Sequence, residues 1–394
     1  MMIQAVLGNP NHPEYGVATI PFSVPHDQYA HCMELLEALE IGDAVKTDCK
    51  VEKIDSFYTV LKRAEMLTVN VEELNYLAKR LDSFDTGEAA QFQAMAHKLE
   101  LFELKDLINL TFCYQQTTVI TDFSDLDAVG RDHYMNLHGG SASVDGLNAL
   151  DGKETARQLI ESDSGTITPY GVVYDNGMKL EPVYDGRFFP CYYYEPNAIT
   201  VVVTSKAEPE DTEHITWLFL PMIQEEVDRA LLRGGITDPA DARLRLEDSQ
   251  LPNEVDVLLD MEYETLFDLN ELAAATDGLS NADMEKLGAV VMLAKPKSAA
   301  QIKNLVESLD LFDFAPGAHT PQEYGKYMIQ QSGHFDYDEN LDAFYDYEKY
   351  GTERMNEEDG MFTGRGYIAY KGYTSLAEIM DGNQSSRIEM GGMA

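Results

Sequence analysis

Positively charged residues are scarce in this chain. Its 394 residues include 29 Lys and Arg against 69 Asp and Glu, which gives a formal net charge of −40 at pH 7. Proteins that bind nucleic acids gain much of their affinity from Lys and Arg side chains that neutralise phosphates. The sequence therefore predicts no direct binding of DNA or RNA. A surface with this charge instead attracts proteins that carry a basic groove, because complementary potentials steer association.

The sequence also lacks the marks of membrane and secreted proteins. It contains no apolar run of the roughly eighteen residues that a membrane-spanning helix needs. Its first residues form neither the basic nor the apolar segment of a signal peptide. The four cysteines, which include no CxxC pair, are Cys32, Cys49, Cys113 and Cys191. We therefore expect free thiols, a cytoplasmic protein and no membrane partner.

Motifs of catalysis and metal binding are absent as well. The chain has no HExxH, no GxxxxGK(S/T), no GxGxxG that opens a helix and no GxSxG. His133 and His138 have no matching Cys or carboxylate array around them. Residues 336–342 alternate like the start of a calcium loop, but Leu341 and Tyr347 occupy positions where Gly and Glu are needed. We expect a protein that is not an enzyme and that has no cofactor and no dedicated metal site.

Residues that form a hydrophobic core are plentiful. Hydrophobic residues make up 44% of the chain, which contains 22 Tyr and 16 Phe. Intrinsic disorder requires low hydrophobicity together with high charge, and only the second condition is met. A chain of this length therefore predicts two or more folded domains.

A fixed offset of 195 residues aligns two parts of the sequence. It places the block Leu74-Asn75-x-Leu77-Ala78 over Leu269-Asn270-x-Leu272-Ala273. The same offset aligns the pairs Asn109/Asn304, Gly130/Gly325, Gly165/Gly360, Thr168/Thr363 and Gly171/Gly366. Because these identities keep one offset without gaps, we interpret them as an internal duplication. The alternative is a chance likeness between two leucine-rich amphipathic helices.

Each copy is predicted to contain three segments. Runs of β-branched and aromatic residues predict strands at 17–22, 118–121, 171–174, 198–203, 215–220 and 366–370. Apolar spacing predicts helices at 27–39 and 225–232 and a helical middle segment in each copy. In that segment Asp85 with Glu88, and Ser280 with Asp283, have the spacing of capping boxes.

The predicted fold class is α+β, in an elongated multi-domain chain whose small antiparallel sheets flank helical segments. Copy one is divided into an α/β segment, a helical segment and an α+β segment at 1–65, 66–115 and 116–178. Copy two is divided in the same way at 179–260, 261–311 and 312–375. Residues 376–394 are expected to form a flexible tail.

The acidic excess is present in both halves of the chain. Residues 1–195 hold 31 acids and 14 bases, and residues 196–394 hold 38 acids and 15 bases. Duplex DNA carries one charge per ~1.7 Å of its axis, so the net charge corresponds to roughly 20 base pairs. The distribution predicts a body that resembles DNA electrostatically.

Acidic clusters are the candidates for binding a basic partner. Tyr rings beside carboxylates suit an interface, since rings supply contact area while the acids face basic groups. For any single residue, a solvated helix face is an equally good interpretation. The candidate residues are Asp122, Asp125, Asp127, Glu208, Glu210, Asp211, Glu213, Asp336, Asp338, Glu339, Asp342, Asp346, Tyr347, Glu348, Tyr350, Glu353, Glu357, Glu358 and Asp359.

Several segments resemble the ArdA antirestriction proteins. The C-terminal resemblance lies in Tyr324-Gly325-Lys326-Tyr327, in residues 341–353, in Gly360-Met361-Phe362-Thr363 and in Gly366-Tyr367-Ile368. Residues 72–78 and 267–272 look like the ELNxL start of the family's central helical domain. Phe344 stands where the family has Tyr, and residues 151–156 of copy one lack the Tyr-rich stretch. The usual member of the family has about the length of one copy.

The resemblance implies a specific function. ArdA-like proteins are encoded on mobile elements, are elongated three-domain α+β molecules and imitate bent B-form DNA inside a bacterial host cell. They occupy the DNA groove of type I restriction-modification enzymes, and they pair through the C-terminal domain near the stretch matched by residues 342–353. We therefore expect an antirestriction protein whose partner is a type I restriction-modification complex, with homodimerisation through the C-terminal segment.

Two alternatives stay open on the sequence. The chain could be an acidic inhibitor of another DNA-binding protein, either a different defence complex or a nucleoid protein. It could also be a salt-adapted acidic protein of unrelated function, whose carboxylates hold hydration water.

Overall fold

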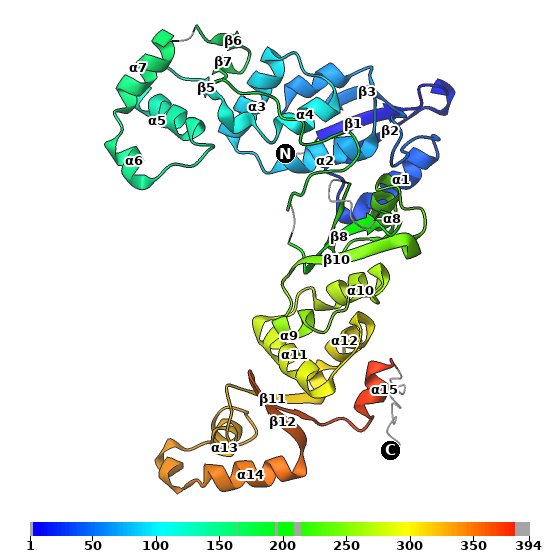
Figure 1. The fold of residues 1–394 in the computed structure, drawn as a ribbon, viewed down its shortest axis with the longest axis vertical. Coiled ribbons are helices and arrows are strands. Elements are labelled where there is room, and N and C mark those ends of the chain that lie inside the picture. The colour runs from blue at the N-terminus through cyan, green and yellow to red at the C-terminus, as the bar shows by residue number, and fades with distance from the viewer. Residues whose placement is uncertain (1–2, 163, 194–195, 209–213, 383–394) are drawn as a thin grey trace, which may run out of the picture. The chain divides into compact units, whose positions relative to one another are not determined.

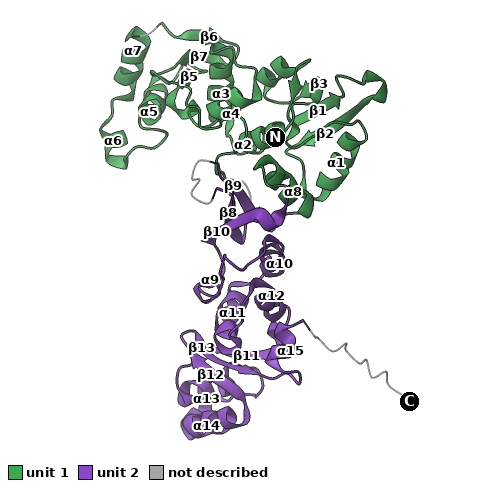
Figure 2. Cartoon of the chain, turned by 45° about the vertical axis from the view of Figure 1, so that its right-hand side comes forward, with its two compact units in different colours: residues 1–195, 223–237 green, residues 196–222, 238–394 purple. Residues whose placement is uncertain are grey.

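The computed structural model describes residues 3–162, 164–193, 196–208 and 214–382. It consists of helices and small antiparallel sheets, which confirms the predicted α+β class. The chain divides into two compact units (Figure 2). Unit 1 comprises residues 1–195 and 223–237, and unit 2 comprises residues 196–222 and 238–394.

Unit 1 begins with an antiparallel sheet in the order β2-β1-β3-β4. One face of β1 is fully buried, because its side chains alternate between core and solvent. The elements of this part are β1 (Ile3–Gly8), η1 (Pro13–Tyr15), β2 (Val17–Phe22), η2 (His26–Gln28), α1 (Tyr29–Glu37), β3 (Cys49–Asp55), η3 (Thr59–Ala64) and β4 (Thr68–Val69).

A layer of helices lies between this sheet and a second one in the order β5-β7-β6 (Figure 1). The helices of the layer are α2 (Val71–Asp82), α3 (Thr86–Lys98), α4 (Leu104–Leu110) and η4 (Tyr114–Gln116). The second sheet and its helices are β5 (Thr118–Ile120), α5 (Leu126–Leu137), α6 (Val144–Ala149), α7 (Gly152–Ser162), β6 (Thr166–Thr168) and β7 (Gly171–Tyr174). The unit is completed by α8 (Gln224–Arg233), which comes from a later part of the chain.

Unit 2 repeats the succession of sheet, helices and sheet. Its sheets have the orders β10-β8-β9 and β11-β13-β12. The elements up to the helical layer are β8 (Ile199–Ser205), β9 (Thr216–Leu220), η5 (Pro239–Asp241), β10 (Ala242–Ser249), α9 (Asn253–Asp256), α10 (Leu266–Thr276), α11 (Asn281–Ala294), α12 (Ala299–Val306) and η6 (Leu309–Leu311). The rest are β11 (Phe312–Pro316), α13 (Pro321–Gln330), η7 (Glu339–Phe344), α14 (Tyr347–Glu357), β12 (Asp359–Thr363), β13 (Gly366–Tyr370) and α15 (Leu376–Met380).

The two units share their strand order and the starting points of their main helices. In both first sheets the first strand is central, and in both second sheets the last strand is central. Helices α2, α3, α5 and α7 begin 195 residues before α10, α11, α13 and α14. Both predicted capping boxes are confirmed, because Asp85 with Glu88 and Ser280 with Asp283 form the reciprocal bonds at the starts of α3 and α11.

The repeated asparagine of the Leu-Asn block has the same structural role in each unit. In unit 1, Oδ1 of Asn75 accepts a hydrogen bond of 2.8 Å from the backbone N–H of Val24. In unit 2, Oδ1 of Asn270 accepts a hydrogen bond of 2.8 Å from the backbone N–H of Met222. Each asparagine therefore joins its helix to the chain that leaves the second strand of the first sheet. The polar residue satisfies a backbone donor that would otherwise lose its partner.

Repeated glycines allow two helices to touch in each second segment. A Cβ added to Gly130 of α5 would lie 1.8 Å from the carbonyl oxygen of Gly152 in α7. A Cβ added to Gly325 of α13 would lie 2.0 Å from the carbonyl oxygen of Tyr347 in α14. No side chain fits at these distances, so the backbones of the paired helices meet directly.

The expectation of a flexible tail from residue 376 is wrong for its first part. Residues Leu376–Met380 form α15, which starts with a capping box between Ser375 and Glu378. Ile379 is 1% exposed, and Nδ2 of Asn304 in α12 donates to the carbonyl oxygen of Met380 at 2.9 Å. Burial of this one apolar side chain anchors the helix. Residues 383–394, which the same expectation covered, lie outside the described residues.

None of the helices in the described residues is both long enough and apolar enough to cross a membrane.

Candidate functional site

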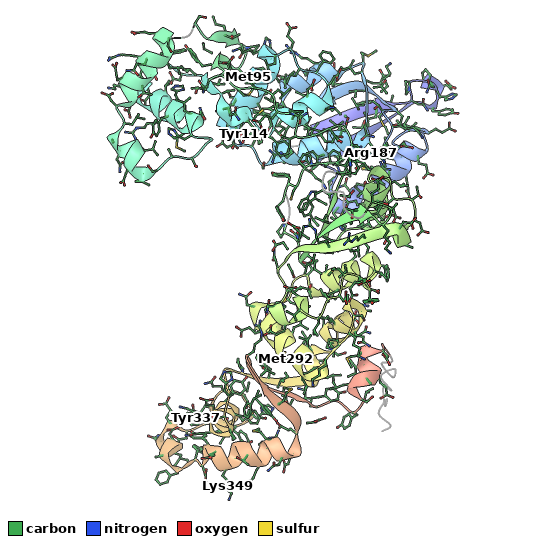
Figure 3. All side chains as sticks on the ribbon, in the orientation of Figure 1. Met95, Tyr114, Arg187, Met292, Tyr337 and Lys349 are labelled. Carbon is green, nitrogen blue, oxygen red and sulfur yellow. The ribbon has the colours of Figure 1, made fainter. Side chains whose placement is uncertain are left out.

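The strongest concentration of charge in the described chain lies on α13, α14 and the loop that joins them. We call residues 321–359 the acidic helical pair; Tyr337 and Lys349 mark its loop and α14 in Figure 3. Residues 336–359 contain ten acids and two bases. Most of the predicted binding carboxylates of this segment are exposed, namely Asp336, Asp338, Glu339, Asp342, Asp346, Glu348, Glu353, Glu357 and Asp359. Glu358, Tyr347 and Tyr350 are half-buried.

Two of these carboxylates also start helical turns. Asp346 accepts a hydrogen bond of 3.0 Å from the backbone N–H of Lys349 and caps α14. Asp338 accepts a hydrogen bond of 2.9 Å from the backbone N–H of Asn340 at the start of η7. Both side chains stay exposed while they satisfy backbone donors. Asp346 and Asp338 therefore stabilise the backbone in addition to any contact they make with a partner.

Asp342 is held by its neighbours. Its Oδ1 accepts hydrogen bonds from the hydroxyls of Tyr337 at 2.7 Å and Tyr347 at 2.6 Å. Nε2 of Gln330 donates to the same oxygen at 2.8 Å. The bonds from Tyr347 and Tyr337 lower the pKa of Asp342, and the bond to the carboxylate raises the pKa of Tyr337. This carboxylate orders the loop and keeps its negative charge.

Glu358 differs from the other acids of the segment. Its carboxylate accepts a hydrogen bond of 2.6 Å from the hydroxyl of Tyr324 and forms an ion pair with Arg354. Burial, and then the bond to Glu358, raise the pKa of Tyr324. These contacts join α13 to the end of α14, so the structure gives Glu358 a packing role.

Few cations offset the exposed acids. Nζ of Lys349 lies 4.0 Å from Glu353, and Nη1 of Arg354 lies 3.8 Å from Glu357. Exposed pairs of this kind contribute little stability. Within the described residues, no ion pair is formed by Asp336, Glu339, Glu348 or Asp359. The acidic helical pair therefore presents a negative potential to solvent.

Exposed apolar side chains lie in the same loop, and sequence reasoning did not include them. Phe344 is 83% exposed, Phe335 is 50% exposed and Leu341 is exposed as well. Phe335 also meets Tyr350 edge to face, with ring centroids 5.9 Å apart. The sequence signal that could have identified these residues is the presence of large apolar side chains in an otherwise charged loop. Apolar area beside charged groups is typical of protein interfaces.

The acidic cluster of unit 1 forms the start of α5. Asp125 caps the helix by accepting from the backbone N–H groups of Asp127 and Ala128, both at 3.1 Å. Asp127 is half-buried and pairs with Arg131 at 2.9 Å. Asp122 is exposed, and hydrogen bonds from Ser124 lower its pKa. Only Asp122 and Asp125 of this cluster are left without a cation among the described residues.

The third predicted cluster is described only at its first member. Glu208 is exposed just after β8. The other three residues of that cluster, Glu210, Asp211 and Glu213, lie outside the described residues.

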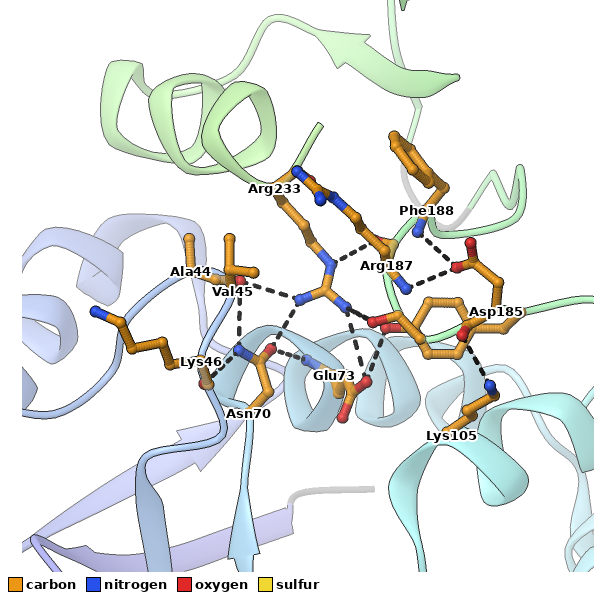
Figure 4. A network of polar contacts seen from close by, with 12 residues as sticks. Ala44, Val45, Lys46, Asn70, Glu73, Lys105, Asp185, Arg187, Phe188 and Arg233 are labelled. Atoms are coloured by element: carbon orange, nitrogen blue, oxygen red, sulfur yellow. Dashed lines mark hydrogen bonds and ion pairs between the residues drawn. The ribbon is translucent and has the colours of Figure 1, made fainter. Parts of the chain in front are cut away.

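Two arginines of α8, Arg229 and Arg233, are paired inside unit 1, and sequence reasoning missed the network of Arg233 that Figure 4 shows. Arg233 of α8 is 5% exposed, and its Nη1 donates to Oδ1 of Asn70 and to the carbonyl oxygen of Ala44, both at 3.0 Å. Arg233 also contacts the Tyr184 hydroxyl and lies 3.7 Å from Glu73. Burial raises the pKa of Glu73, while Tyr184 and Arg233 oppose that shift.

One turn earlier on α8, Nε of Arg229 lies 2.5 Å from Oε1 of Glu72. Residues far apart in the sequence meet here, which is why no local pattern revealed the network. It has a consequence for the surface, because arginines that are paired inside the protein cannot neutralise acids outside it. Replacing one partner of such a buried pair would destabilise the fold, because the other partner would remain as an uncompensated charge.

Among the described residues, no group of three or more His, Cys, Asp or Glu side chains is arranged to hold a metal ion. The carboxylates of the acidic helical pair point to solvent and not to a common centre, apart from those bound by Tyr, Gln or Arg. What this arrangement can do is bind a basic surface.

The matched family agrees with that chemistry. Residues 212–369 match the family model described as Antirestriction protein (ArdA). The match includes the whole acidic helical pair and confirms the resemblance for this part of the chain. The C-terminal part of the chain is thus similar to the ArdA family. No curated protein matches the chain.

Proposed function

We propose that the protein is an antirestriction protein that mimics B-form DNA and occupies the DNA-binding groove of type I restriction-modification enzymes. It acts by binding and catalyses no reaction. One observation carries the proposal: an exposed segment with ten acids and two bases, residues 336–359, lies inside the region that matches the ArdA family. Carboxylates with few neighbouring cations offer a basic groove the same charge as backbone phosphates.

The proposal includes a duplication, in which each copy is one ArdA-like unit. Three observations support it: the shared strand orders, the helix starts 195 residues apart and the matching bonds of Asn75 and Asn270. The family model matches only the second copy. In the first copy, residues 151–156 stand where the Tyr-rich stretch would lie, and they lack it.

The proposal also includes pairing of two chains through the loop of the acidic helical pair. The exposed side chains of Phe335, Leu341 and Phe344 support this, because association would remove them from water. Analytical ultracentrifugation tests it: replacement of Phe344 by Ser should shift a dimer toward the monomer. A wild-type chain that is monomeric at all concentrations would exclude pairing.

The experiment that tests the main proposal is a competition between this protein and DNA. A type I methyltransferase complex is loaded with a labelled DNA duplex, and the full chain is added at two salt concentrations. We expect displacement of DNA near an equimolar ratio, and weaker displacement at higher salt, because salt screens the attraction. DNA that stays bound in excess protein would reject a type I target. Displacement of DNA from a nucleoid protein alone would favour the alternative client.

A further inference from the structure

A pair of charged side chains crosses α11 in the helical layer of unit 2. Arg365 lies in the turn between β12 and β13, and Glu254 lies in α9, beside α11 (Figure 1). Nε of Arg365 donates to Oε1 of Glu254 at 2.9 Å, and its Nη2 donates to Oε2 at 2.8 Å. One guanidinium group therefore holds both oxygens of the carboxylate, which fixes the direction of the contact as well as its length.

Both ends of this contact are fixed in the fold. The backbone N–H of Arg365 donates to Oγ1 of Thr363 at 3.2 Å, and its carbonyl oxygen accepts from the N–H of Gly317 at 2.8 Å. Glu254 is followed by Val255, which is 0% exposed. The side chains of the pair are 29% and 24% exposed, so water screens them less than a pair on the open surface. The hydrogen bond from Arg365 lowers the pKa of Glu254, which keeps the pair ionised.

A glycine of α11 makes room for the arginine. A Cβ added to Gly288 would lie 2.3 Å from Nε of Arg365, so any other residue at this position would displace the guanidinium group. The sheet β11-β13-β12 packs on the same helix. The side chain of Arg365 therefore runs directly over the backbone of α11 and ties the β12–β13 turn to α9.

Unit 1 makes the same connection with different chemistry. At the offset of 195 residues, Tyr170 takes the place of Arg365. Its hydroxyl forms a hydrogen bond of 2.7 Å with Oγ1 of Thr59, which takes the place of Glu254. Gln93 occupies the position of the α11 glycine. The connection is thus common to both units, while the charged double contact belongs to the unit that carries the acidic helical pair.

We propose that Arg365 is a positioning residue for the binding of the restriction-modification enzyme. Through Glu254 it holds the sheet that carries the acidic helical pair in one orientation on the helical layer, so that the carboxylates meet the basic groove in register. This rests on the proposed function. The apolar contacts of the sheet with α11 are non-directional, whereas the two hydrogen bonds of the pair are directional. A binding constellation needs to be held to about 0.5 Å and 10–20°.

The sign of a mutational effect separates positioning from charge. Arg365→Ala makes the chain more negative, so attraction to a basic groove alone would improve inhibition. Positioning predicts the opposite, and we expect the half-maximal inhibitory concentration in the DNA competition to rise roughly fivefold. Arg245→Ala is the matched control for loss of one cation, since the side chain of Arg245 is 65% exposed and pairs only with Glu247 of its own strand, at 3.2 Å. The control should leave the value unchanged or lower it, and inhibition by Arg365→Ala as strong as that of the control would overturn the inference.

Two further variants test the contact itself. Arg365→Lys keeps the charge but cannot form the double contact, and should raise the inhibitory concentration about twofold. Exchange of the pair, Arg365→Glu with Glu254→Arg, keeps the net charge and restores an ion pair over α11. It should inhibit better than Arg365→Glu alone, as a coupled pair requires. A double variant no better than the single one would mean that Arg365 acts without Glu254, which contradicts the proposal.

A distance measurement does not depend on the proposed function. Spin labels are attached to the exposed positions Ala274 of α10 and Gln322 of α13 in the full chain, the partly exposed Cys191 is replaced by Ser, and unlabelled protein is added in excess to suppress distances between chains. Pulsed electron paramagnetic resonance should give a narrow distance distribution in the wild type, a broader one in Arg365→Ala and a narrow one again in the exchanged pair.

The two kinds of measurement have separate consequences. If the wild type fails to displace DNA but the distributions differ as expected, the proposed function fails and the orienting contact stands. Equal distributions in the wild type and Arg365→Ala would overturn the inference, whatever the inhibition. If Arg365→Ala does not fold, Arg365→Lys takes its place in this comparison under the same criterion.

Discussion

The α5–α7 region of unit 1 and the acidic helical pair of unit 2 have the same framework and different surfaces. Both sheets have the last strand in the centre, and both helix pairs meet at a glycine. Residues 141–164 of unit 1 contain five acids and two bases, whereas the equivalent residues 336–359 contain ten acids and two bases. The comparison teaches that glycine, threonine and asparagine positions maintain the fold, while exposed positions change charge without cost to it.

The β6–β7 hairpin of unit 1 and the β12–β13 hairpin of unit 2 share threonine and glycine positions with the same structural role. Oγ1 of Thr168 donates to the carbonyl oxygen of Gly171 at 2.8 Å, and Oγ1 of Thr363 donates to that of Gly366 at 2.8 Å. The two glycines have φ of 131° and 141°, a conformation that disfavours other residues. Identities that looked scattered in the sequence therefore mark positions with backbone requirements.

The largest expected effect comes from filling the helix contacts. Gly325→Ala and Gly130→Ala should each destabilise their own region by about 3 kcal/mol, because the added Cβ would overlap a backbone carbonyl. Hydrogen exchange resolved by segment measures the loss. Gly364→Ala is the control, since nothing lies within 4 Å of its added Cβ. If only one of the two glycine variants loosens its region, the frameworks are not equivalent.

Smaller losses are expected from the repeated asparagines. Asn75→Ala removes the acceptor for the backbone N–H of Val24, a buried hydrogen bond, and should cost about 1–3 kcal/mol. Asn270→Ala should cost less, because the bonds of Asn270 with Met222 are only partly buried. Chemical denaturation followed by a probe in each unit would check the order. The reverse order would contradict the burial argument.

The surfaces are compared by reversing three charges in each region. The unit 2 variant carries Glu339→Lys, Glu348→Lys and Glu353→Lys, and the unit 1 variant carries Asp145→Lys, Glu154→Lys and Glu161→Lys. All six side chains are exposed, so neither variant should unfold. We expect the unit 2 variant to raise the half-maximal inhibitory concentration roughly tenfold in the DNA competition, and the unit 1 variant to raise it less. Equal weakening would mean that both regions contact the enzyme alike.

The sequence revealed features that depend on local pattern. Strands β8 and β9 were predicted because they are apolar and β-branched, and the capping boxes were predicted from their spacing. Strands β3 and β10 were not predicted, because Lys, Arg and Glu interrupt them. In β10 the signal was present, since buried Ala242 and Leu244 alternate with exposed arginines.

The sequence predicted where acidic residues are dense in the candidate site, and it did not predict which side chains contact one another. Composition alone located the acidic helical pair. It could not show that Glu358 is bonded to Tyr324, or that Arg233 is buried against Asn70, because these partners come together only in the fold. Long-range pairing decides which carboxylates are free.

The smallest expected effect tests the ordered loop that only unit 2 has. At the offset of 195 residues, Leu147 and Gly152 stand where Asp342 and Tyr347 form their bond, so unit 1 has no counterpart. The bond lowers the pKa of Asp342 in the folded protein below the ordinary value of about 3.9. Its contribution to stability is therefore present above that ordinary value and is lost as pH falls through the lowered pKa.

Tyr347→Phe should move the pKa of Asp342 back toward its ordinary value, because Tyr347 contributes the largest part of the shift. NMR titration of the Asp342 carboxyl carbon measures this in the full chain. Tyr345→Phe is the matched control, since the ring of Tyr345 makes tilted contacts with those of Tyr337 and Tyr347, whereas the hydrogen bonds to Asp342 come from Tyr337 and Tyr347. An unchanged titration in Tyr347→Phe would show that the loop is not ordered by Asp342. The difference between the two regions would then rest on surface charge alone.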